Sequence, residues 1–341
     1  MINVQGLTKQ YGSVEAVTDV SFEVGRDQVV GFLGPNGAGK TTIMKIIAGY
    51  HFPTRGTVTI DGLSVQEDPL ALKARLGYLP ESVPLYGDLT VEEYLSFVAG
   101  ARLIPAKERK PAIREALKAC GLEQAAGKRI ETLSKGYKQR AGLAQAIIHD
   151  PDILILDEPT SGLDPNQIIE IRALIKELGK RKTLILSTHI LQEVEAVCSQ
   201  VLIINEGRIA AQGRPEAIAE TLKGTDTWEL TLKDPGREEG ETQGGREKIA
   251  QKMARLAEGL ADGEAPAREA DGTFHVSFSV PSGSLGGERI FDWAVAEGLK
   301  ILSMTQKKLS LEAIFVKLTG EHEGRPAQGA AAAEGDGDAR L

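Results

Sequence analysis

The stretch Gly34-Pro35-Asn36-Gly37-Ala38-Gly39-Lys40-Thr41-Thr42 decides the fold expected for this chain. It lies between two apolar runs, at 29–33 and 43–47, which predict a buried strand before it and a helix after it, beginning near Lys40. A strand, the pattern G-x-x-x-x-G-K-[ST] and a helix form the order of a P-loop. The glycines let backbone N–H groups turn inward around a phosphate, and the helix N-terminus adds partial positive charge. We therefore predict a phosphate-binding site in this stretch.

Two side chains of this stretch have predicted roles toward a nucleotide. Lys40 is expected to reach the β- and γ-phosphates, and the Thr41 hydroxyl is expected to ligate Mg²⁺. The alternative is a glycine turn with a solvated lysine, and the flanking strand and helix argue against it.

The composition limits the possible classes of protein. The chain has 341 residues, enough for two domains, and 48 acidic against 40 basic residues give a formal net charge of −8. This balance argues against nucleic acid as the main partner. Cys120 and Cys198 lie in segments of helical pattern, so we expect the reduced thiols of a cytosolic protein. Residues 1–5 lack the pattern of a signal peptide, and no apolar window approaches the roughly 18 residues of a membrane span.

A pair of carboxylates follows the apolar run 153–156, which is typical of a strand buried on both faces of a parallel sheet. Asp157 and Glu158 would lie at its carboxyl end, where such sheets bind ligands. Two adjacent buried carboxylates need a cation or a shared proton. With a P-loop upstream, we predict that Asp157 holds Mg²⁺ and that Glu158 positions and deprotonates the attacking water. The alternative is that both only cap the next turn.

A histidine follows another expected strand, at 183–187. A single histidine is more often a core residue than a reactive one. His189 would, however, lie at the same sheet edge as Asp157 and Lys40, so we predict that it takes part in catalysis.

The segment 133–140 leads into a helix with an apolar face. Ser134 is placed to cap this helix, and Gly136 leaves its first turn open, so the helix start is a second possible anion site. Any capped helix has the same pattern, and a purely structural role is the alternative.

Two alternating stretches, 2–4 and 20–24, predict antiparallel strands, with Tyr11 and Gly12 in the turn between them. The ring of Tyr11 either stacks on an adenine or closes the edge of the sheet. Further on, helical spacing at 90–99 and 106–121 predicts a helical subdomain over about 88–150. Its first helix starts with a capping box, from Thr90 to Glu93.

The composition changes from residue 227 onward. Expected strands at 228–232, 274–278 and 301–304, with helices at 249–260, 288–297 and 310–318, predict a small α+β domain over 223–320. The loop 234–246 is rich in glycine and charge and is expected to be mobile, and 321–341 is expected to be a solvated tail. Regulation, dimerisation and packing remain alternative roles for this domain.

Together these motifs resemble the nucleotide-binding subunit of an ABC transporter over about residues 2–220. The resemblance implies an α/β P-loop NTPase core over 1–222, with an antiparallel β subdomain and a helical subdomain, that binds and hydrolyses ATP with Mg²⁺. It also implies that Tyr11 stacks on adenine, that the stretch from Gly34 is the Walker A motif and that Asp157 and Glu158 are the Walker B pair. The segment 133–137 is similar to the family signature, 161–164 to its D-loop, which ends at Asp164, and His189 to its switch histidine.

The resemblance implies partners as well. Two ATP-binding subunits of this family close head to tail, so that Ser134 and Gly136 of one contact the γ-phosphate held by Lys40 of the other. The pair acts with integral-membrane permease subunits, which implies a cytoplasmic protein at the inner face of the cell membrane. A homodimer and a heterodimer are both compatible with the sequence. The sequences of the segments 77–81, 133–140 and 186–193 are similar to those of ABC-2-type exporters, in particular the gliding-motility-like subgroup.

Two positions depart from the family pattern. Glu81 stands where the Q-loop glutamine is expected, and a carboxylate there can ligate Mg²⁺ but also repels the γ-phosphate. We expect Glu81 to sense the metal and to couple hydrolysis to a membrane partner. Lys135 and Tyr137 replace the commoner glycine and glutamine of the signature, and Lys135 either contacts phosphate across the dimer or is solvated.

Two other functions compete with transport. Soluble ABC ATPases of DNA repair or translation resemble this chain in their motifs, but they carry coiled-coil insertions or a second cassette, and neither is evident in this sequence. A nucleotide-binding regulator without catalysis is the second alternative, and phosphate release by the purified chain distinguishes it.

Overall fold

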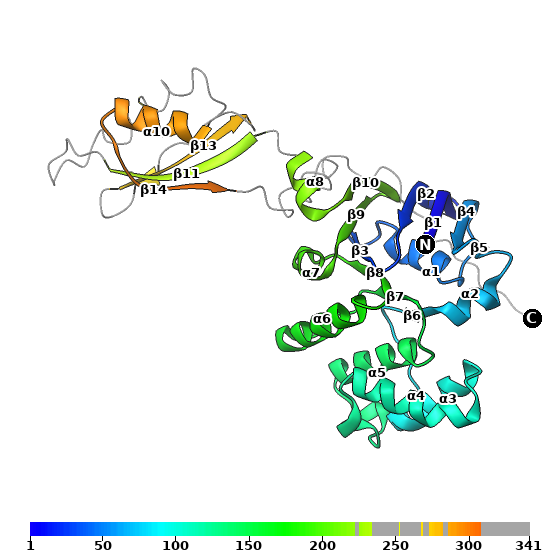
Figure 1. Cartoon of the computed structure of the whole chain (residues 1–341). Helices are drawn as coiled ribbons and strands as arrows, with labels where there is room; N and C mark the ends of the chain where they lie inside the picture. Colours follow the sequence, from blue (N-terminus) through cyan, green and yellow to red (C-terminus); the bar gives the residue numbers. More distant parts are fainter. Residues whose placement is uncertain (222–224, 234–251, 253–266, 269–272, 282–285, 308–341) are drawn as a thin grey trace, which may run out of the picture.

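The computed structural model describes residues 1–221, 225–233, 252, 267–268, 273–281 and 286–307. The strands of these residues form three sheets (Figure 1). The expected loop at 234–246, the helices at 249–260 and 310–318 and the tail at 321–341 lie outside the described residues, apart from Lys252.

The N-terminal sheet is antiparallel and forms the β subdomain that the alternating stretches predict. Alternate residues of its first strand, such as Ile2 and Val4, are buried against the core, while their neighbours are more exposed. The strand order is β2-β1-β4-β5. The strands are β1 (Ile2–Tyr11), β2 (Val14–Val24), β4 (Arg55–Ile60) and β5 (Leu63–Ser64).

The central sheet carries the continuous apolar runs, and all of its strands except β10 run parallel. Its order is β10-β9-β3-β8-β7-β6, so β8 lies between β3 and β7. The carboxyl ends of these three strands therefore meet at one edge. The strands are β3 (Val29–Leu33), β6 (Leu76–Leu79), β7 (Ile153–Asp157), β8 (Thr183–Thr188), β9 (Gln200–Asn205) and β10 (Arg208–Gly213).

Helices cover both faces of the central sheet, which explains why its inner strands β3, β7 and β8 are buried at every position and carry continuous apolar runs. Helix α1 (Lys40–Ile47) packs between the two sheets, and its Met44 shares a core with Phe22 and Ile155. On the other face, α6 (Pro165–Gly179) contributes Ile171 to a core with Leu154 of β7. The predicted α/β core is thus confirmed.

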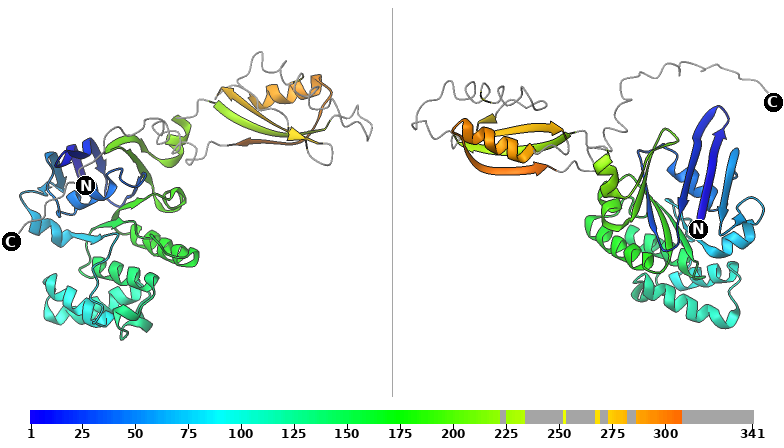
Figure 2. Two further views of the ribbon diagram at one scale, coloured as in Figure 1. Left: turned by 180° about the vertical axis from the view of Figure 1, so that it is seen from behind. Right: turned by 45° about the horizontal axis from the view of Figure 1, so that its top comes forward.

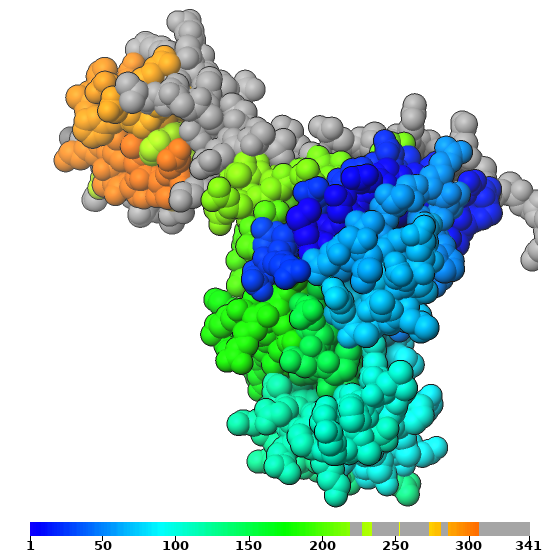
Figure 3. Space-filling view, turned by 45° about the vertical axis from the view of Figure 1, so that its right-hand side comes forward, coloured from blue at the N-terminus to red at the C-terminus, as the bar shows by residue number. Residues whose placement is uncertain are grey.

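A helical subdomain lies below this core and forms a lobe of its own in Figure 3. The predicted capping box is present at its first helix, because the Glu93 N–H donates to Thr90 Oγ1 over 3.2 Å and the Thr90 N–H donates to Glu93 Oε2 over 2.8 Å. The helices are α3 (Val91–Ala101), α4 (Ala106–Ala119) and α5 (Lys135–Ile147), with 3-10 turns at Glu123–Ala125 and Ile130–Thr132.

Three helices were not predicted: α2 (Pro69–Arg75), α7 (Leu191–Val197) and α8 (Pro215–Thr221). Each has seven residues, which is two turns and too short to establish a helical period in the sequence.

The C-terminal sheet is antiparallel with the order β12-β13-β11-β14. Helix α10 covers one face of it, as the right-hand view of Figure 2 shows, and its Trp293 packs edge-on against Phe278. The expected strands and the helix at 288–297 are confirmed, whereas the short β12 was not predicted. The elements are β11 (Thr225–Lys233), β12 (Ala267–Arg268), β13 (Phe274–Pro281), α10 (Gly286–Ala296) and β14 (Lys300–Lys307).

Both cysteines are free, as the sequence predicts. Burial raises the pKa of Cys120 and of Cys198 to about 12, so both stay protonated at neutral pH. In the part of the chain that the structure describes, no helix combines the length and the apolar content that crossing a bilayer requires.

Candidate functional site

The P-loop connects β3 to α1, and two of its glycines are required by neighbouring backbone. A Cβ on Gly34 would lie 2.3 Å from the carbonyl oxygen of Ile204 in β9. Gly39 has φ +104°, and a Cβ there would lie 2.6 Å from the carbonyl oxygen of Ala16 in β2. The loop backbone can therefore follow this path only with glycine at these two positions. The path brings the N–H groups of the loop to the start of α1.

Lys40 is the first residue of α1 and is 5% exposed. Its ammonium donates to the carbonyl oxygens of Gly34, over 2.8 Å, and Pro35, over 3.1 Å. It also lies 3.5 Å from Oε1 of Glu158. The positive charge is thus held inside the loop that the sequence predicts to bind phosphate.

Asp157 ends β7 and is fully buried. Its Oδ1 accepts from Thr41 Oγ1 over 3.1 Å and from Ser187 Oγ over 2.5 Å. Its Oδ2 has no hydrogen-bond partner among the residues that the structure describes. A buried carboxylate oxygen beside a hydroxyl offers the hard oxygen ligands that Mg²⁺ takes, so these residues fit that ion.

Glu158 follows directly and has φ 47°, in the left-handed region that only a few per cent of non-glycine residues adopt. Its N–H donates to the carbonyl oxygen of Ser187 over 3.2 Å and to Ser187 Oγ over 3.0 Å. These bonds to β8 hold the unusual conformation and turn the side chain toward the P-loop. Strained residues held in this way are common at active sites.

His189 follows β8, and its Nδ1 lies 2.9 Å from Oε2 of Glu158. A cavity of about 310 Å³ adjoins these groups. It brings together most of the predicted site residues, and its lining consists of Ala16, Asn36, Gly37, Ala38, Gly39, Lys40, Thr41, Thr42, Glu81, Glu158, Ser161 and His189.

Tyr11 is a predicted residue that does not line this cavity. It ends β1, is 43% exposed, and meets His51 edge-on with ring centroids 6.0 Å apart. The Lys9 ammonium lies 4.9 Å from the centre of its ring. This ammonium lies over one face of the ring, and stacking of Tyr11 on an adenine stays a prediction.

Ser134, Gly136 and Asp164 also lie outside the lining of this cavity. Ser134 caps α5 as predicted, accepting from the Tyr137 N–H over 3.4 Å. Asp164 caps α6, accepting from the Gln167 N–H over 2.9 Å. A Cβ on Gly136 would lie 2.7 Å from Cδ of Gln167, so glycine lets α5 approach α6 here. The predicted contacts of these residues are to a second subunit.

Lys135 lies against the turn that precedes α6 within its own chain. A Cβ on Gly162 would lie 1.9 Å from the Lys135 ammonium, so the two residues are in close contact. Gly162 also has φ +67°, and for that reason a side chain there would be strained.

Two buried hydroxyls at this site were not predicted from the sequence. Ser187 pairs directly with Asp157 in the β7–β8 register, and Tyr78 in β6 pairs with Ile155, two residues before Asp157. Burial raises the pKa of Tyr78 strongly, and the Asp157 carboxylate raises it further, so the phenol stays protonated. A polar residue within an apolar strand was the only signal in the sequence for either.

A P-loop, a carboxylate pair and a histidine, each at the carboxyl end of a parallel strand, define a P-loop ATPase of the ABC class. The family model described as ABC transporter matches residues 17–161. The chain is 39% identical over 234 residues to the uncharacterized ABC transporter ATP-binding protein YxlF of Bacillus subtilis, covering 69% of this chain and 77% of that protein.

Two further similarities agree with this class. The Nod factor export ATP-binding protein I of Ralstonia nicotianae is 36% identical over 67% of this chain and 72% of its own length. A dimeric structure of a bacterial ABC transporter cassette superposes with a TM-score of 0.58 at 27% identity, over 63% of this chain and 98% of the cassette. The chain belongs to the ABC transporter ATP-binding protein family, and it is an ATPase that serves as the ATP-binding subunit of an ABC transporter.

Proposed function

We propose that this subunit hydrolyses Mg-ATP within a head-to-tail pair of ATP-binding subunits and drives export through separate membrane subunits. The observation that carries the proposal is the position of Glu158, which lies between Lys40 and His189 beside the P-loop. The similarity to a Nod factor export protein supports the direction of transport. In this proposal the nucleotide-binding domain spans 1–222, and an accessory domain follows over 223–320.

Each side chain has a definite task in this proposal. The P-loop amides and Lys40 bind the phosphates, while Thr41 and Asp157 would hold Mg²⁺, which neutralises charge on the phosphate oxygens when bound. Glu158 orients the attacking water and accepts its proton at the carboxylate. His189 holds that carboxylate through Oε2 and so fixes its direction.

The second subunit completes the site. Ser134, Gly136 and Asp164 lie away from the cavity of their own chain, and in a head-to-tail pair they would face the phosphates bound by the other. The N-terminus of α5 offers free N–H groups and partial positive charge to a phosphate. Similarity to a dimeric cassette supports this arrangement.

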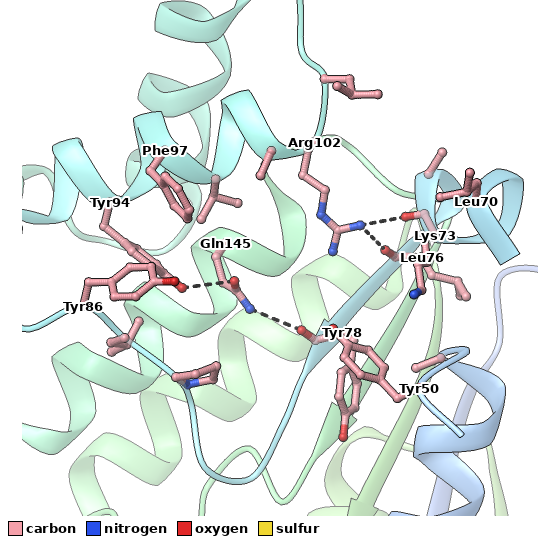
Figure 4. Close-up of a pocket in the computed structure, with 17 residues that line it drawn as sticks. Tyr50, Leu70, Lys73, Leu76, Tyr78, Tyr86, Tyr94, Phe97, Arg102 and Gln145 are labelled. Atoms are coloured by element: carbon pink, nitrogen blue, oxygen red, sulfur yellow. Dashed lines mark hydrogen bonds between the residues drawn. The ribbon is translucent and has the colours of Figure 1, made fainter. Parts of the chain in front are cut away.

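A groove of about 590 Å³ is the proposed docking site for a membrane subunit (Figure 4). It lies between the core and the helical subdomain, and its aromatic walls are more than half exposed, at 61% for Tyr50, 55% for Tyr86 and 54% for Phe97. Lys73 supplies a cation at one end, with its ammonium 5.5 Å from the Tyr50 ring. Such a surface fits a short amphipathic helix with apolar side chains and one carboxylate.

The floor of the groove leads toward the nucleotide cavity. Tyr94 donates to Gln145 over 3.1 Å, and Gln145 donates to the carbonyl oxygen of Tyr78 over 3.4 Å (Figure 4). Glu81 comes three residues after Tyr78 and lines the nucleotide cavity. A helix bound in the groove would therefore shift the segment that carries Glu81. In this proposal the subunit lies at the inner face of the membrane, beside its partner.

The test of coupling is Glu81→Gln in the complex assembled with its membrane subunits. Transport per ATP hydrolysed should change, because the substitution removes the charge next to the metal and the γ-phosphate. Unchanged ATPase and transport rates would show that Glu81 has no coupling role.

A further inference from the structure

A third buried carboxylate, in addition to those of Asp157 and Glu158, lies outside the nucleotide cavity. Glu193, in α7, is 2% exposed. Its Oε1 accepts from Thr160 Oγ1 over 2.5 Å, and its Oε2 accepts from Thr188 Oγ1 over 2.7 Å. The Arg172 guanidinium lies 3.5 Å from Oε1. A carboxylate is costly to bury without partners, and these three contacts offset that cost.

The partners belong to three different segments, and two of these carry the reactive side chains. Thr160 comes two residues after Glu158, and Thr188 comes directly before His189. Arg172 belongs to α6. One carboxylate thus joins the turn after β7 to the last residue of β8 and to the helix that Asp164 caps.

The bond to Thr188 also fixes the backbone on the far side of the histidine. Thr188 Oγ1 accepts from the Ile190 N–H over 3.0 Å, so the hydroxyl spans His189. The His189 side chain is 46% exposed and bonds to Glu158 through Nδ1. Because nearly half of this side chain is exposed, the position of the ring depends strongly on the backbone that Thr188 holds.

We propose that Glu193 is a positioning residue for ATP hydrolysis, which keeps Glu158 and His189 at hydrogen-bonding distance through Thr160 and Thr188. It does not line the nucleotide cavity and touches no reacting atom. The link to Arg172 connects this alignment to α6, whose N-terminus faces the second subunit in the proposed dimer. The inference rests on the proposed roles of Glu158 and His189.

The experiment compares Glu193→Gln with Glu195→Gln, an exposed glutamate two residues further along α7. The amide keeps the size of Glu193 but removes its charge and one acceptor. Turnover at saturating ATP should fall about tenfold to a hundredfold, as expected for a misplaced catalytic pair. The dissociation constant for a fluorescent ATP analogue should stay within about twofold, since the P-loop is untouched. Glu195→Gln should behave as the unchanged chain does.

A second comparison tests the hydroxyl alone and does not depend on Glu193→Gln folding. Thr188→Ser keeps the oxygen and should retain turnover, whereas Thr188→Val removes it at similar volume and should lose turnover to the extent that Glu193→Gln does. The double variant should be no slower than either single one, because both break the same link.

Three results would overturn the inference: turnover of Glu193→Gln within about twofold of the unchanged chain, a parallel loss of ATP affinity, or equal activity of the serine and valine variants. Failure of the proposed function would give a different result. Glu158→Gln would then hydrolyse ATP at the normal rate, whatever the activity of the Glu193 variants.

Discussion

His189 bonds to Glu158, with Nδ1 of the histidine 2.9 Å from Oε2 of the carboxylate. The other carboxylate oxygen lies 3.5 Å from the Lys40 ammonium. Glu158 therefore lies between the residue that binds phosphate and the residue after β8, and both contacts restrict the direction of its side chain. A base held in this way needs little reorganisation to meet a water beside the γ-phosphate.

The contact predicts that His189→Ala slows hydrolysis and leaves nucleotide binding intact. Without the imidazole, the Glu158 carboxylate gains freedom, and we expect turnover to fall at least about tenfold. Two measurements on the same preparation check this. Steady-state phosphate release gives the rate of hydrolysis, and titration with an ATP analogue gives the affinity for nucleotide. An equal loss of both would mean that His189 supports binding rather than chemistry.

The proposed metal site predicts that Asp157→Asn weakens binding of the divalent ion. The substitution removes the charge next to Thr41 but keeps the hydrogen-bonding shape, so the fold should persist. Mn²⁺ binding in the presence of ATP, followed by electron paramagnetic resonance, should weaken by about tenfold or more. Asp152→Asn is the matched control, because Asp152 is exposed and directly precedes β7, at the end of the strand away from the cavity. Unchanged Mn²⁺ affinity in Asp157→Asn would remove this residue from the metal site.

His149 predicts how stability depends on pH. Its Nε2 donates to the carbonyl oxygen of Leu76 over 3.0 Å, and its buried Nδ1 has no partner among the described residues. Burial, with Arg102 nearby, lowers the pKa of His149 to about 4. In the unfolded chain, His149 takes up a proton near the ordinary histidine pKa of about 6.5. In the folded chain, it stays neutral until the pH approaches 4. Stability from this group is therefore complete above about pH 6.5 and is lost as the pH falls toward 4.

Urea unfolding at pH 7 and pH 5 measures this effect. After allowance for solvent screening, we expect His149 to lower the free energy of unfolding at pH 5 by on the order of 1 kcal/mol relative to pH 7. His149→Gln should lack this part of the pH dependence, because glutamine does not titrate. The same slope in both proteins would assign the effect to other groups.

The docking groove predicts that Phe97→Glu prevents assembly with the membrane subunits. A carboxylate in the middle of the aromatic wall removes apolar contact and must be desolvated on binding. Phe291→Glu is the matched control, since Phe291 lies in α10 with 53% exposure against 54% for Phe97. Co-purification with the membrane subunits should be lost only for Phe97→Glu, while both variants unfold at similar temperatures. Loss in both, or in neither, would contradict the assignment.

Local patterns account for most of what the sequence predicted. The P-loop and the Asp157–Glu158 pair are contiguous stretches next to strongly apolar strands, so their structure and their shared sheet edge follow from the order of residues alone. The same holds for the Thr90 capping box.

The rest depends on register and tertiary packing. Ser187 reaches Asp157 only because β7 and β8 pair as they do, and Glu193 meets Thr160 only because α7 folds back beside β8. No local spacing encodes either contact. For the same reason the sequence could not show that Gly136 touches Gln167 of α6.

In the proposed cycle, two copies of the P-loop site close around ATP, and Glu158 then activates the water that attacks the γ-phosphate. The decisive measurement is the molar mass of Glu158→Gln by light scattering, with and without Mg-ATP, together with its rate of phosphate release. We expect a dimer that forms only with Mg-ATP, hydrolysis slowed at least about a hundredfold, and no dimer once Lys40→Ala is added. A variant that stays monomeric with bound Mg-ATP and releases phosphate at the normal rate would rule out this cycle.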